Sequence, residues 1–228
     1  MSNNIYVGWD SREDIAYQVC EHSIRRRTNQ NSVNVSPLKQ NELREQKLYW
    51  REQDKLSSTE FTITRFLVPH LNKFTGWAAF CDCDMVWRSD PSELFSQVDD
   101  SKAVMVVKHD YTPQEGIKMD GQIQMPYPRK NWSSMILWNC GHPKNSALDL
   151  ETVNTASPSF LHRFEWLDDE DIGTLDHSWN WLVGWYDVER DGDPKIIHYT
   201  EGGPWFEETR HCEFGHIWKQ ELINLYSS

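Results

Sequence analysis

The chain has 228 residues, enough for one sizeable hydrophobic core, and we expect a single domain. Hydrophobic residues make up 38% and charged residues 25%, which is typical of a globular protein and excludes an extensively disordered one. The formal net charge of −12 argues against general attraction to nucleic acid or anionic lipid, so a polyanionic ligand needs local cations or a bound metal.

The first third of the chain predicts a β-α-β unit. Residues 4–10 form a short apolar strand, and residues 11–27 carry apolar side chains at helical spacing. Residues 32–38 alternate like a second strand. Such a unit is typical of a parallel sheet that binds ligands at the carboxyl ends of its strands.

The middle of the chain continues this alternation. We expect helices at residues 57–74 and 91–97 and strands at residues 76–84, 102–109 and 132–140. Between the last two strands, residues 110–131 are rich in proline and glycine and are expected to face the substrate.

The last third predicts a helix, an acidic turn and a second helix within residues 158–186, a strand at 195–200 and a terminal helix at 216–226. No repeat or linker divides the chain. The expected fold class is therefore α/β, a single α/β/α domain with a mostly parallel, Rossmann-like central sheet.

No apolar run reaches the roughly 18 residues of a membrane span, and the N-terminal segment lacks the basic and apolar regions of a secretory signal. The five cysteines are odd in number and irregularly spaced, which favours reduced thiols over a disulfide framework. We therefore expect a cytoplasmic protein.

Two carboxylates stand at the end of the strand expected at residues 76–84. Asp82 and Asp84 are two residues apart, so both side chains of an extended strand point to the same side. Adjacent carboxylates at the end of a buried run repel each other unless a cation or proton lies between them, and Mn²⁺ or Mg²⁺ favours such oxygen ligands. The alternative is a turn cap and an ion pair with Arg88.

A second signal lies in the segment KIIHYTEGGPWF, residues 195–206. His198 follows an apolar strand start, and Gly202 and Gly203 lead into a sharp turn whose backbone N–H groups are suited to phosphate oxygens. Each feature by itself also fits a structural role.

Three blocks in this order resemble the GT-A nucleotide-sugar glycosyltransferases, most closely the family 8 group that includes glycogenin and bacterial galactosyltransferases. The blocks are IYVGWD, FCDCDMVWRSDPSELF and IIHYTEGGPW, and the segment FTITRFL before the second block also matches. The resemblance covers most of the chain. It implies a GT-A-like fold and Mn²⁺-dependent transfer of a hexose or pentose from a nucleotide diphosphate, a UDP-sugar, to a saccharide or other hydroxyl acceptor. It also implies that residues 1–110, roughly, bind the nucleotide and that residues 111–228 bind the acceptor and the donor sugar.

By this resemblance, Asp82, Asp84 and His198 are metal ligands, and the ion bridges the donor diphosphate. The residues expected to contact the donor are Gly8, Asp10, Arg65, Asp82, Gly202 and Gly203. Arg65 would contact the donor sugar and take part in catalysis. The alternatives are a helix N-terminal acid for Asp10 and a surface cation for Arg65.

The chain departs from the family pattern in its terminal motif, which is His-x-x-Gly-x-x-Lys-Pro-Trp. Here Trp205 comes one residue early, and Gly203 stands where the phosphate-binding lysine is expected. Lys195, Arg129 or Lys130 is expected to replace that cation. Retention or inversion of the anomeric configuration stays open.

The second departure concerns the donor-sugar segment. In place of Asp-Gln-Asp-x-x-Asn the chain has LDHSWNW, in which Asn180 matches the asparagine and Asp176 falls beside the reacting face of the sugar. In the acidic run 168–171, Asp171 is a second catalytic candidate, because inverting GT-A enzymes use a carboxylate after such a stretch to deprotonate the acceptor. A solvated acidic turn is the alternative.

Two other functions are compatible with these motifs. One is a nucleotide-sugar or carbohydrate-binding protein of the same fold without turnover, which the missing lysine suggests. The other is a metal-dependent phosphohydrolase, although one Asp-x-Asp pair and one histidine offer few ligands for a two-metal site. Some of the twelve tryptophans would stack on a saccharide acceptor, with these candidates: Trp132, Trp138, Trp179, Trp181 and Trp205. The oligomeric state stays open.

Overall fold

The computed structural model describes residues 3–28, 33–52, 58–109, 116–117, 123–124, 129 and 131–227. The strands are β1 (Asn3–Gly8), β2 (Val33–Leu38), β3 (Trp77–Cys81), β4 (Met85–Trp87), β5 (Val104–Val107), β6 (Gly116–Ile117), β7 (Ile123–Gln124), β8 (Met135–Asn139), β9 (Ile172–Leu175), β10 (Trp181–Leu182) and β11 (Ile196–His198). The α-helices are α1 (Asp14–Arg26), α2 (Gln40–Glu45), α3 (Val68–Leu71), α4 (Pro91–Phe95), α5 (Leu150–Thr155), α6 (Pro158–His162), α7 (Val188–Asp191) and α8 (Gly215–Ser227). The 3₁₀ helices are η1 (Thr64–Leu67), η2 (Trp132–Ser134), η3 (Pro143–Ala147), η4 (Asp169–Asp171) and η5 (His177–Asn180).

The central sheet has the strand order β2-β1-β3-β8-β5-β9. Among these strands β8 alone runs antiparallel to its neighbours, and the others share one direction. The carboxyl ends of β1 and β3 lie level because Val7 pairs with Cys81, and those of β5 and β9 because Val107 pairs with Leu175. The predicted α/β class with a mostly parallel sheet is confirmed, and this carboxyl edge is where its loops gather.

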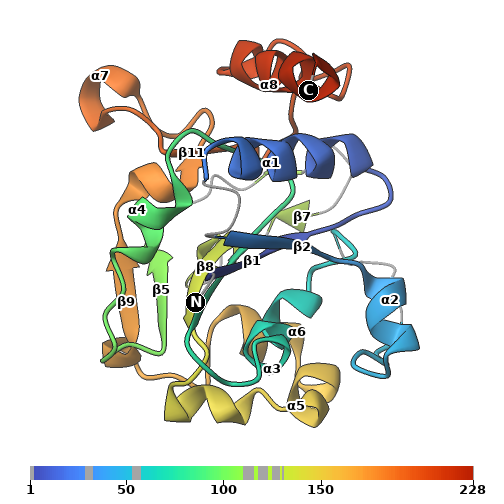
Figure 1. Ribbon diagram of the computed structural model, residues 1–228, viewed down its shortest axis with the longest axis vertical. Coiled ribbons are helices and arrows are strands. Elements are labelled where there is room, and N and C mark those ends of the chain that lie inside the picture. Colours follow the sequence, from blue (N-terminus) through green and yellow to red (C-terminus); the bar gives the residue numbers. More distant parts are fainter. Residues whose placement is uncertain are drawn as a thin grey trace.

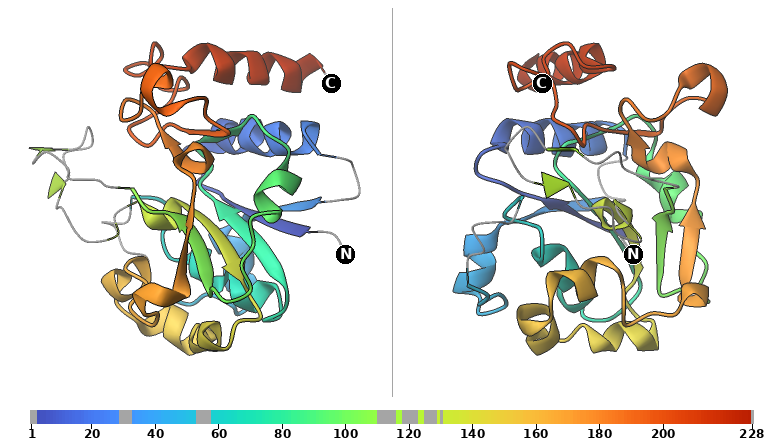
Figure 2. Two further views of the ribbon diagram at one scale, coloured as in Figure 1. Left: turned by 90° about the vertical axis from the view of Figure 1, so that its left-hand side faces the viewer. Right: turned by 180° about the vertical axis from the view of Figure 1, so that it is seen from behind.

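Helices cover both faces of the sheet, as Figures 1 and 2 show. Helix α1 lies on one face with α8 packed outside it, and α3, α5 and α6 lie on the other face. Glu221 anchors α8 because its nearly buried carboxylate accepts from His22 Nδ1 at 2.9 Å and from Arg27 Nη2 at 3.2 Å. The predicted C-terminal helix therefore exists and forms an additional outer layer.

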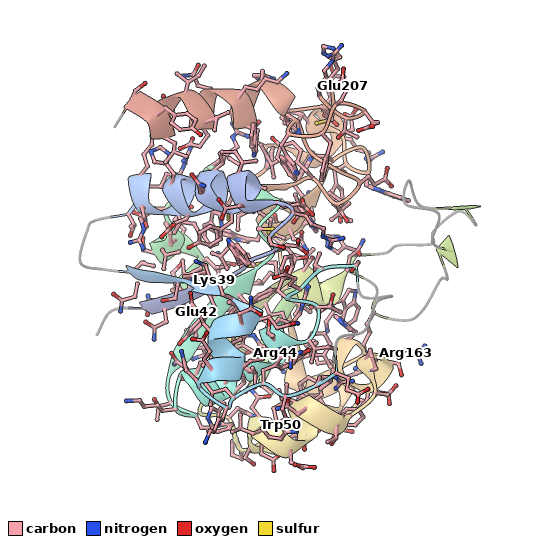
Figure 3. The ribbon with its side chains drawn as sticks, turned by 90° about the vertical axis from the view of Figure 1, so that its right-hand side faces the viewer. Lys39, Glu42, Arg44, Trp50, Arg163 and Glu207 are labelled. Carbon is pink, nitrogen blue, oxygen red and sulfur yellow. The ribbon has the colours of Figure 1, made fainter. Side chains whose placement is uncertain are left out.

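Helix α2 follows β2 at one end of the sheet, and Figure 3 labels Lys39, Glu42 and Arg44 around it. Lys39 Nζ lies 3.7 Å from Glu42 Oε1, and the Arg44 guanidinium lies 5.0 Å from the centre of the Tyr49 ring. The charges of this helix are thus engaged locally.

A smaller sheet brings the C-terminal part of the chain to the carboxyl end of β3. Its order is β10-β11-β4, with β11 antiparallel to β4. His198 pairs with Met85, directly after the Asp-x-Asp segment, and with Leu182 on the other side. This pairing places His198 beside two aspartates that precede it by more than a hundred residues.

Three predicted elements are wrong in part. The helix expected at residues 57–74 is limited to η1 and α3, because the β-branched run Thr62, Ile63 and Thr64 disfavours an earlier helix. The second helix expected within residues 158–186 is replaced by β9, an apolar segment that pairs with β5. The strand expected at residues 76–84 ends at Cys81, so the aspartates lie beyond it.

The two functional parts expected at residues 1–110 and 111–228 share one sheet, since β8 lies between β3 and β5. Their division into nucleotide and acceptor parts stays a prediction. Most of the stretch 110–131, expected to face the substrate, lies outside the described residues. Among the described helices, none combines the length and apolar character that a bilayer span requires.

Candidate active site

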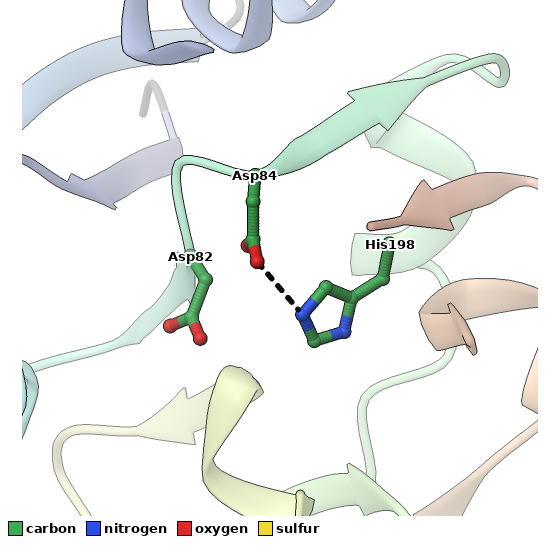
Figure 4. Close-up of side chains that lie close together, drawn as sticks. All are labelled: Asp82, Asp84 and His198. Atoms are coloured by element: carbon green, nitrogen blue, oxygen red, sulfur yellow. Dashed lines mark ion pairs between the residues drawn. The ribbon is translucent and has the colours of Figure 1, made fainter. Parts of the chain in front are cut away.

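Asp82, Asp84 and His198 converge at the carboxyl edge of the sheet, and we call them the Asp-Asp-His cluster (Figure 4). Each offers one ligand atom, and these atoms lie within 4.8 Å of one another. His198 Nε2 is 3.4 Å from Asp84 Oδ2. In the described part of the chain no other group of three His, Cys, Asp or Glu side chains is close enough to share an ion.

The two aspartates converge because of a tight turn, and the extended strand expected from their spacing is wrong. They lie between β3 and β4, where the Asp82 N–H donates to Ser134 O at 2.9 Å. The Tyr199 N–H donates to Asp84 O at 3.0 Å. The turn is therefore held on one side by Ser134, the last residue of η2, and on the other by Tyr199, the residue after β11, while Cys83 is buried.

Arg65 lies beneath this turn. It is 5% exposed, so the alternative of a surface cation is wrong. Its Nη1 lies 2.9 Å from Asp82 Oδ1 and donates to Ser133 O at 2.7 Å. Asp82 is ion-paired with Arg65, whereas the alternative of an ion pair with Arg88 is not seen, because Arg88 Nη1 lies 3.9 Å from Asp193.

The cluster carries opposing electrostatic effects. Burial raises the pKa of Asp82 to about 7, and the charge of Asp84 adds to this increase. Burial also raises the pKa of Asp84, but His198 outweighs it and lowers that pKa below the usual range. Burial lowers the pKa of His198, yet Asp84 and Asp82 together raise it. Ionising both carboxylates at this distance is unfavourable unless positive charge is added nearby.

The donor set fits a hard divalent cation. Asp84 Oδ1 is buried and has no hydrogen-bond partner among the described residues, whereas Asp82 Oδ1 is ion-paired with Arg65 Nη1 at 2.9 Å. Unpaired buried oxygens are rare in native structures unless an ion or water completes them. Two carboxylates and one imidazole suit Mn²⁺ or Mg²⁺ and leave further coordination positions for substrate oxygens.

Asn180 orients the histidine of the cluster. His198 Nδ1 lies 2.8 Å from Asn180 Oδ1, and Asn180 Nδ2 donates to Ser134 Oγ at 2.9 Å. With its Nδ1 proton donated to Asn180, His198 turns Nε2 toward the aspartates, and this second contact is what metal-binding histidines usually have. The sequence matched Asn180 to a family asparagine but did not predict its contact with His198.

At the end of β1, Asp10 is fully buried. Oδ1 accepts from the N–H and Nε of Arg12 at 2.9 and 3.0 Å, and Oδ2 accepts from Arg12 Nη2 and from the Glu60 N–H. Burial by itself would raise the pKa of Asp10, but these hydrogen bonds have the larger combined effect, so the pKa lies below its usual value. Asp10 thus holds the exposed guanidinium of Arg12 at this edge, and sequence reasoning missed Arg12.

Aromatic rings leave no space for a side chain at Gly8 or at Gly203. A Cβ atom on Gly8 would lie 2.4 Å from the ring of Phe61, and one on Gly203 would lie 1.9 Å from the ring of Trp205. Gly202 has φ +107°, a conformation that favours glycine. Trp205 therefore occupies the space that a lysine side chain at position 203 would need, which explains the departure from the family motif.

Glu13 ties this loop to α1. The Trp205 Nε1–H donates to Glu13 Oε2 at 3.1 Å. Burial raises the pKa of Glu13 to about 7, with further contributions from Asp84 and Asp10. Glu13 is thus a third acidic group near the cluster, and only its place at a helix start signalled it in the sequence.

The cations expected to replace the lysine are engaged elsewhere or not described. Lys195 Nζ donates to Glu93 at 2.9 Å and lies 4.7 Å from the centre of the Trp179 ring. Arg129 pairs with Asp169 and donates to Phe164 O at 3.2 Å. Lys130 lies outside the described residues.

The two catalytic aspartate candidates lie at opposite edges of the sheet. Asp176 follows the carboxyl end of β9, and its side chain is 60% exposed. Its Oδ1 accepts from the Ser178 N–H at 2.9 Å. Asp171 precedes β9, at the amino edge, and its Oδ2 accepts from Lys144 Nζ at 2.6 Å and from the Asp168 N–H at 2.9 Å. The contacts of Asp171 are those of a structural acidic turn, away from the cluster.

Most tryptophans expected to form a saccharide surface are part of the core. Trp138, Trp179 and Trp181 are buried, whereas Trp132 and Trp205 are partly exposed. Burial excludes the first three from stacking on an acceptor in this structure.

The chain is similar in fold to solved glycosyltransferases. The match to the galactosyltransferase LgtC, solved in complex with donor and acceptor sugar analogs, covers 97% of this chain and 95% of LgtC, with a TM-score of 0.59 and 9% identity. The apo form of GlyE from Streptococcus pneumoniae TIGR4 gives a TM-score of 0.63 at 12% identity over 98% of this chain. The bifunctional WbbM gives 0.61 at 16% identity over 99% of this chain. The chain spans about half of WbbM (51%) and 60% of GlyE.

These likenesses confirm the predicted GT-A fold, whereas membership of family 8 stays a prediction. No family model matches the sequence. A curated protein, Protein CDI from Arabidopsis thaliana, is 53% identical over 221 residues, which cover 96% of this chain and 85% of that protein. At this identity over nearly the whole length, the chain belongs to the same family as Protein CDI of Arabidopsis thaliana.

Proposed function

We propose that this protein is a metal-dependent glycosyltransferase, a hexosyl- or pentosyltransferase that moves a sugar from a UDP-sugar to a hydroxyl acceptor. The observation that carries the proposal is the Asp-Asp-His cluster, with the buried and unpaired Oδ1 of Asp84, at the carboxyl edge of a GT-A fold. Open α/β sheets bind ligands at this edge. A metal ion held by such a cluster is suited to stabilise the negative charge of a departing diphosphate.

Asp82, Asp84 and His198 would hold Mn²⁺ or Mg²⁺, which when bound supplies positive charge to the diphosphate as the sugar leaves. Arg65 holds Asp82 in place through a buried ion pair, so its first role is to orient that ligand. We retain Arg65 as a donor-sugar contact because its guanidinium lies against the cluster. The net charge of −12 makes such local cations necessary.

The nucleotide would lie between the end of β1 and the loop 202–205. Asp10 and Gly8 form one side, and the turn at Gly202 and Gly203 forms the other. The Gly202 N–H donates to Tyr199 O at 2.8 Å, so the Gly203 N–H is the group we propose for phosphate oxygens. The Glu13–Trp205 hydrogen bond joins the two sides. The diphosphate would then lie near Asp84, because the Tyr199 N–H just before this loop donates to Asp84 O at 3.0 Å.

Asp176 is the carboxylate we propose for the reacting face of the sugar. It lies at the same edge of the sheet as the cluster, and Ser178 lowers its pKa below the usual value although burial raises it. It is therefore ionised at neutral pH and able to stabilise developing positive charge or to accept a proton. Asp171, at the opposite edge, is not carried into this proposal.

A panel of sugar nucleotides with and without Mn²⁺, with released nucleotide as the readout, tests the proposal. We expect release from at least one donor that depends on Mn²⁺ and stops with excess chelator. Full activity in chelator would contradict metal dependence. Hydrolysis of simple phosphate esters in place of donor cleavage would favour the phosphohydrolase.

The second candidate is a nucleotide-sugar-binding protein of the same fold with weak or no turnover. Trp205 over Gly203 favours it, since no lysine is available in the loop to support the departing diphosphate. Mn²⁺-dependent UDP binding without sugar release across the panel would select this candidate over the transferase.

We also propose a cytoplasmic location. All five cysteines are free thiols, and four of them are buried, as in a reducing compartment. Localisation of the tagged protein in cells tests this.

A further inference from the structure

His109, two residues after β5, is a buried polar residue with one unused nitrogen. It is 7% exposed, and its Nδ1 lies 2.7 Å from Tyr186 Oη. Its Nε2 is buried and makes no hydrogen bond with any described residue. A buried polar atom without a partner is costly, and in a native structure it often marks a place where a ligand or water completes the bond.

The fold places His109 at the same edge of the sheet as the Asp-Asp-His cluster. β5 runs parallel to β3, so both carboxyl ends open to this side. Burial, with smaller contributions from the charges of His198 and His177, lowers the pKa of His109 to about 3. The Tyr186 ring contacts both His109 and His177, which places these two side chains close together at this edge. His109 is not itself close enough to join the cluster as a ligand.

Aromatic rings hold the imidazole in position. The centre of the Tyr186 ring lies 5.0 Å from that of His177, 5.2 Å from that of Trp181 and 6.0 Å from that of His109. Trp181 belongs to β10, whose next residue pairs with His198. The Tyr186 hydroxyl and this ring cluster therefore set the direction of Nε2, with little freedom for the imidazole to turn.

We propose that His109 is a specificity-determining residue whose Nε2 hydrogen-bonds a hydroxyl group of the sugar carried by the nucleotide diphosphate. This inference rests on the proposed function, because the diphosphate at the cluster brings its sugar to this edge. A neutral imidazole adds little to the binding of a phosphate, whereas it matches a hydroxyl, which donates or accepts as the tautomer requires. Tyr186 is a positioning residue that acts through His109.

A matched pair of substitutions separates the two ring nitrogens. The amide of Asn reaches about as far as Nδ1, so His109→Asn keeps the partner of Tyr186 but removes the group at Nε2. The amide of Gln reaches about as far as Nε2, so His109→Gln restores it. Binding of UDP and of the sugar nucleotides UDP-glucose, UDP-galactose and UDP-xylose is measured by calorimetry with Mn²⁺ for the wild type and both variants.

For the sugar nucleotide that the wild type binds most tightly, we expect His109→Asn to weaken affinity by about tenfold and His109→Gln by about threefold or less. UDP affinity should stay the same in all three proteins, because UDP has no sugar beyond the diphosphate. If His109→Asn does not fold, Tyr186→Phe replaces it, with a smaller loss confined to the sugar nucleotide.

The outcomes separate the two proposals. Wild-type binding of UDP with Mn²⁺, together with equal sugar-nucleotide affinity in all variants, overturns the role of His109 and leaves the proposed function standing. Parallel loss of UDP and sugar-nucleotide affinity in the folded His109→Asn protein also overturns it. Absence of Mn²⁺-dependent UDP binding in the wild type overturns the proposed function and the inference together.

Discussion

The two edges of the central sheet both carry acidic side chains, yet their environments are opposite. At the carboxyl edge, Asp84 Oδ1 is buried without a hydrogen-bond partner among the described residues, beside Asp82, whose Oδ1 is ion-paired with Arg65. At the amino edge, Lys144 Nζ donates to both Asp168 and Asp171, and the Asp168 N–H donates to Asp171. An acidic group whose partners come from its own chain is structural, whereas one left incomplete in a buried place is suited to a ligand.

The largest expected effect is the loss of turnover in Asp84→Asn. The amide keeps the size of the side chain but removes a charged ligand from the carboxyl edge, so we expect Mn²⁺-dependent donor cleavage to fall by about a hundredfold or more. Mn²⁺ should raise the unfolding temperature of the wild type and not that of the variant. Turnover within threefold of the wild type would show that this edge does not bind the ion.

Substitution of Asn180 by Ala tests the orientation of His198. Loss of a second contact to a metal-binding histidine typically weakens metal affinity by about 10- to 100-fold. We therefore expect the Mn²⁺ concentration for half-maximal UDP binding to rise by that factor, with saturating Mn²⁺ restoring UDP affinity. A variant with wild-type Mn²⁺ dependence would mean that Asn180 serves packing alone.

Asp171→Ala probes the opposite edge, where the effect should be on stability. Loss of the hydrogen bond from the Asp168 N–H and of the Lys144 contact should lower the free energy of unfolding by about 1 kcal/mol. Denaturant unfolding measures this, and donor cleavage per folded molecule should not change. A large loss of activity at unchanged stability would return Asp171 to the list of catalytic candidates and erase the contrast between the edges.

Residues near strand ends could be predicted, and residues that depend on tertiary pairing could not. The apolar run before Asp82 and the strand before His198 are local signals, and family blocks supplied their pairing. Asp171 was a catalytic candidate because inverting GT-A enzymes use a carboxylate after such an acidic stretch. Since β9 was predicted as part of a helix, the sequence did not show that Asp171 lies at the amino edge. The same limit hid the contact between Asn180 and His198, since it requires β10 and β11 to be side by side.

The loop 202–205 shows the same limit on a smaller scale. The sequence revealed that a lysine is missing at position 203, but not that the ring of Trp205 covers that glycine. The Trp205 ring is placed by its packing against Tyr199 and Trp218. A local sequence pattern does not predict these contacts. A departure from a family motif can therefore be explained only when the structure shows which side chain fills the space of the missing one.

The smallest expected effect comes from Glu13. Its carboxylate accepts one hydrogen bond, from Trp205, so it is less completely hydrogen-bonded than Asp171 and more so than Asp84 Oδ1. Its folded-state pKa of about 7 lies above the usual value of 4.5, mainly because of burial, so folding favours the neutral form. The wild type therefore loses stability as the pH rises from about 4.5 through 7. Glu13→Gln keeps an oxygen for Trp205 and carries no charge.

We expect Glu13→Gln to unfold at the same temperature as the wild type at about pH 3, where Glu13 is neutral in both states, and at a higher temperature at pH 8. Thermal unfolding at both pH values, without added metal, measures the difference. Asp14→Asn serves as the control, because Asp14 is exposed on the same helix and its charge should not produce this pH dependence. If Glu13→Gln is no more stable than the wild type at pH 8, the carboxylate of Glu13 is already compensated, and the excess negative charge at the carboxyl edge is confined to Asp82 and Asp84.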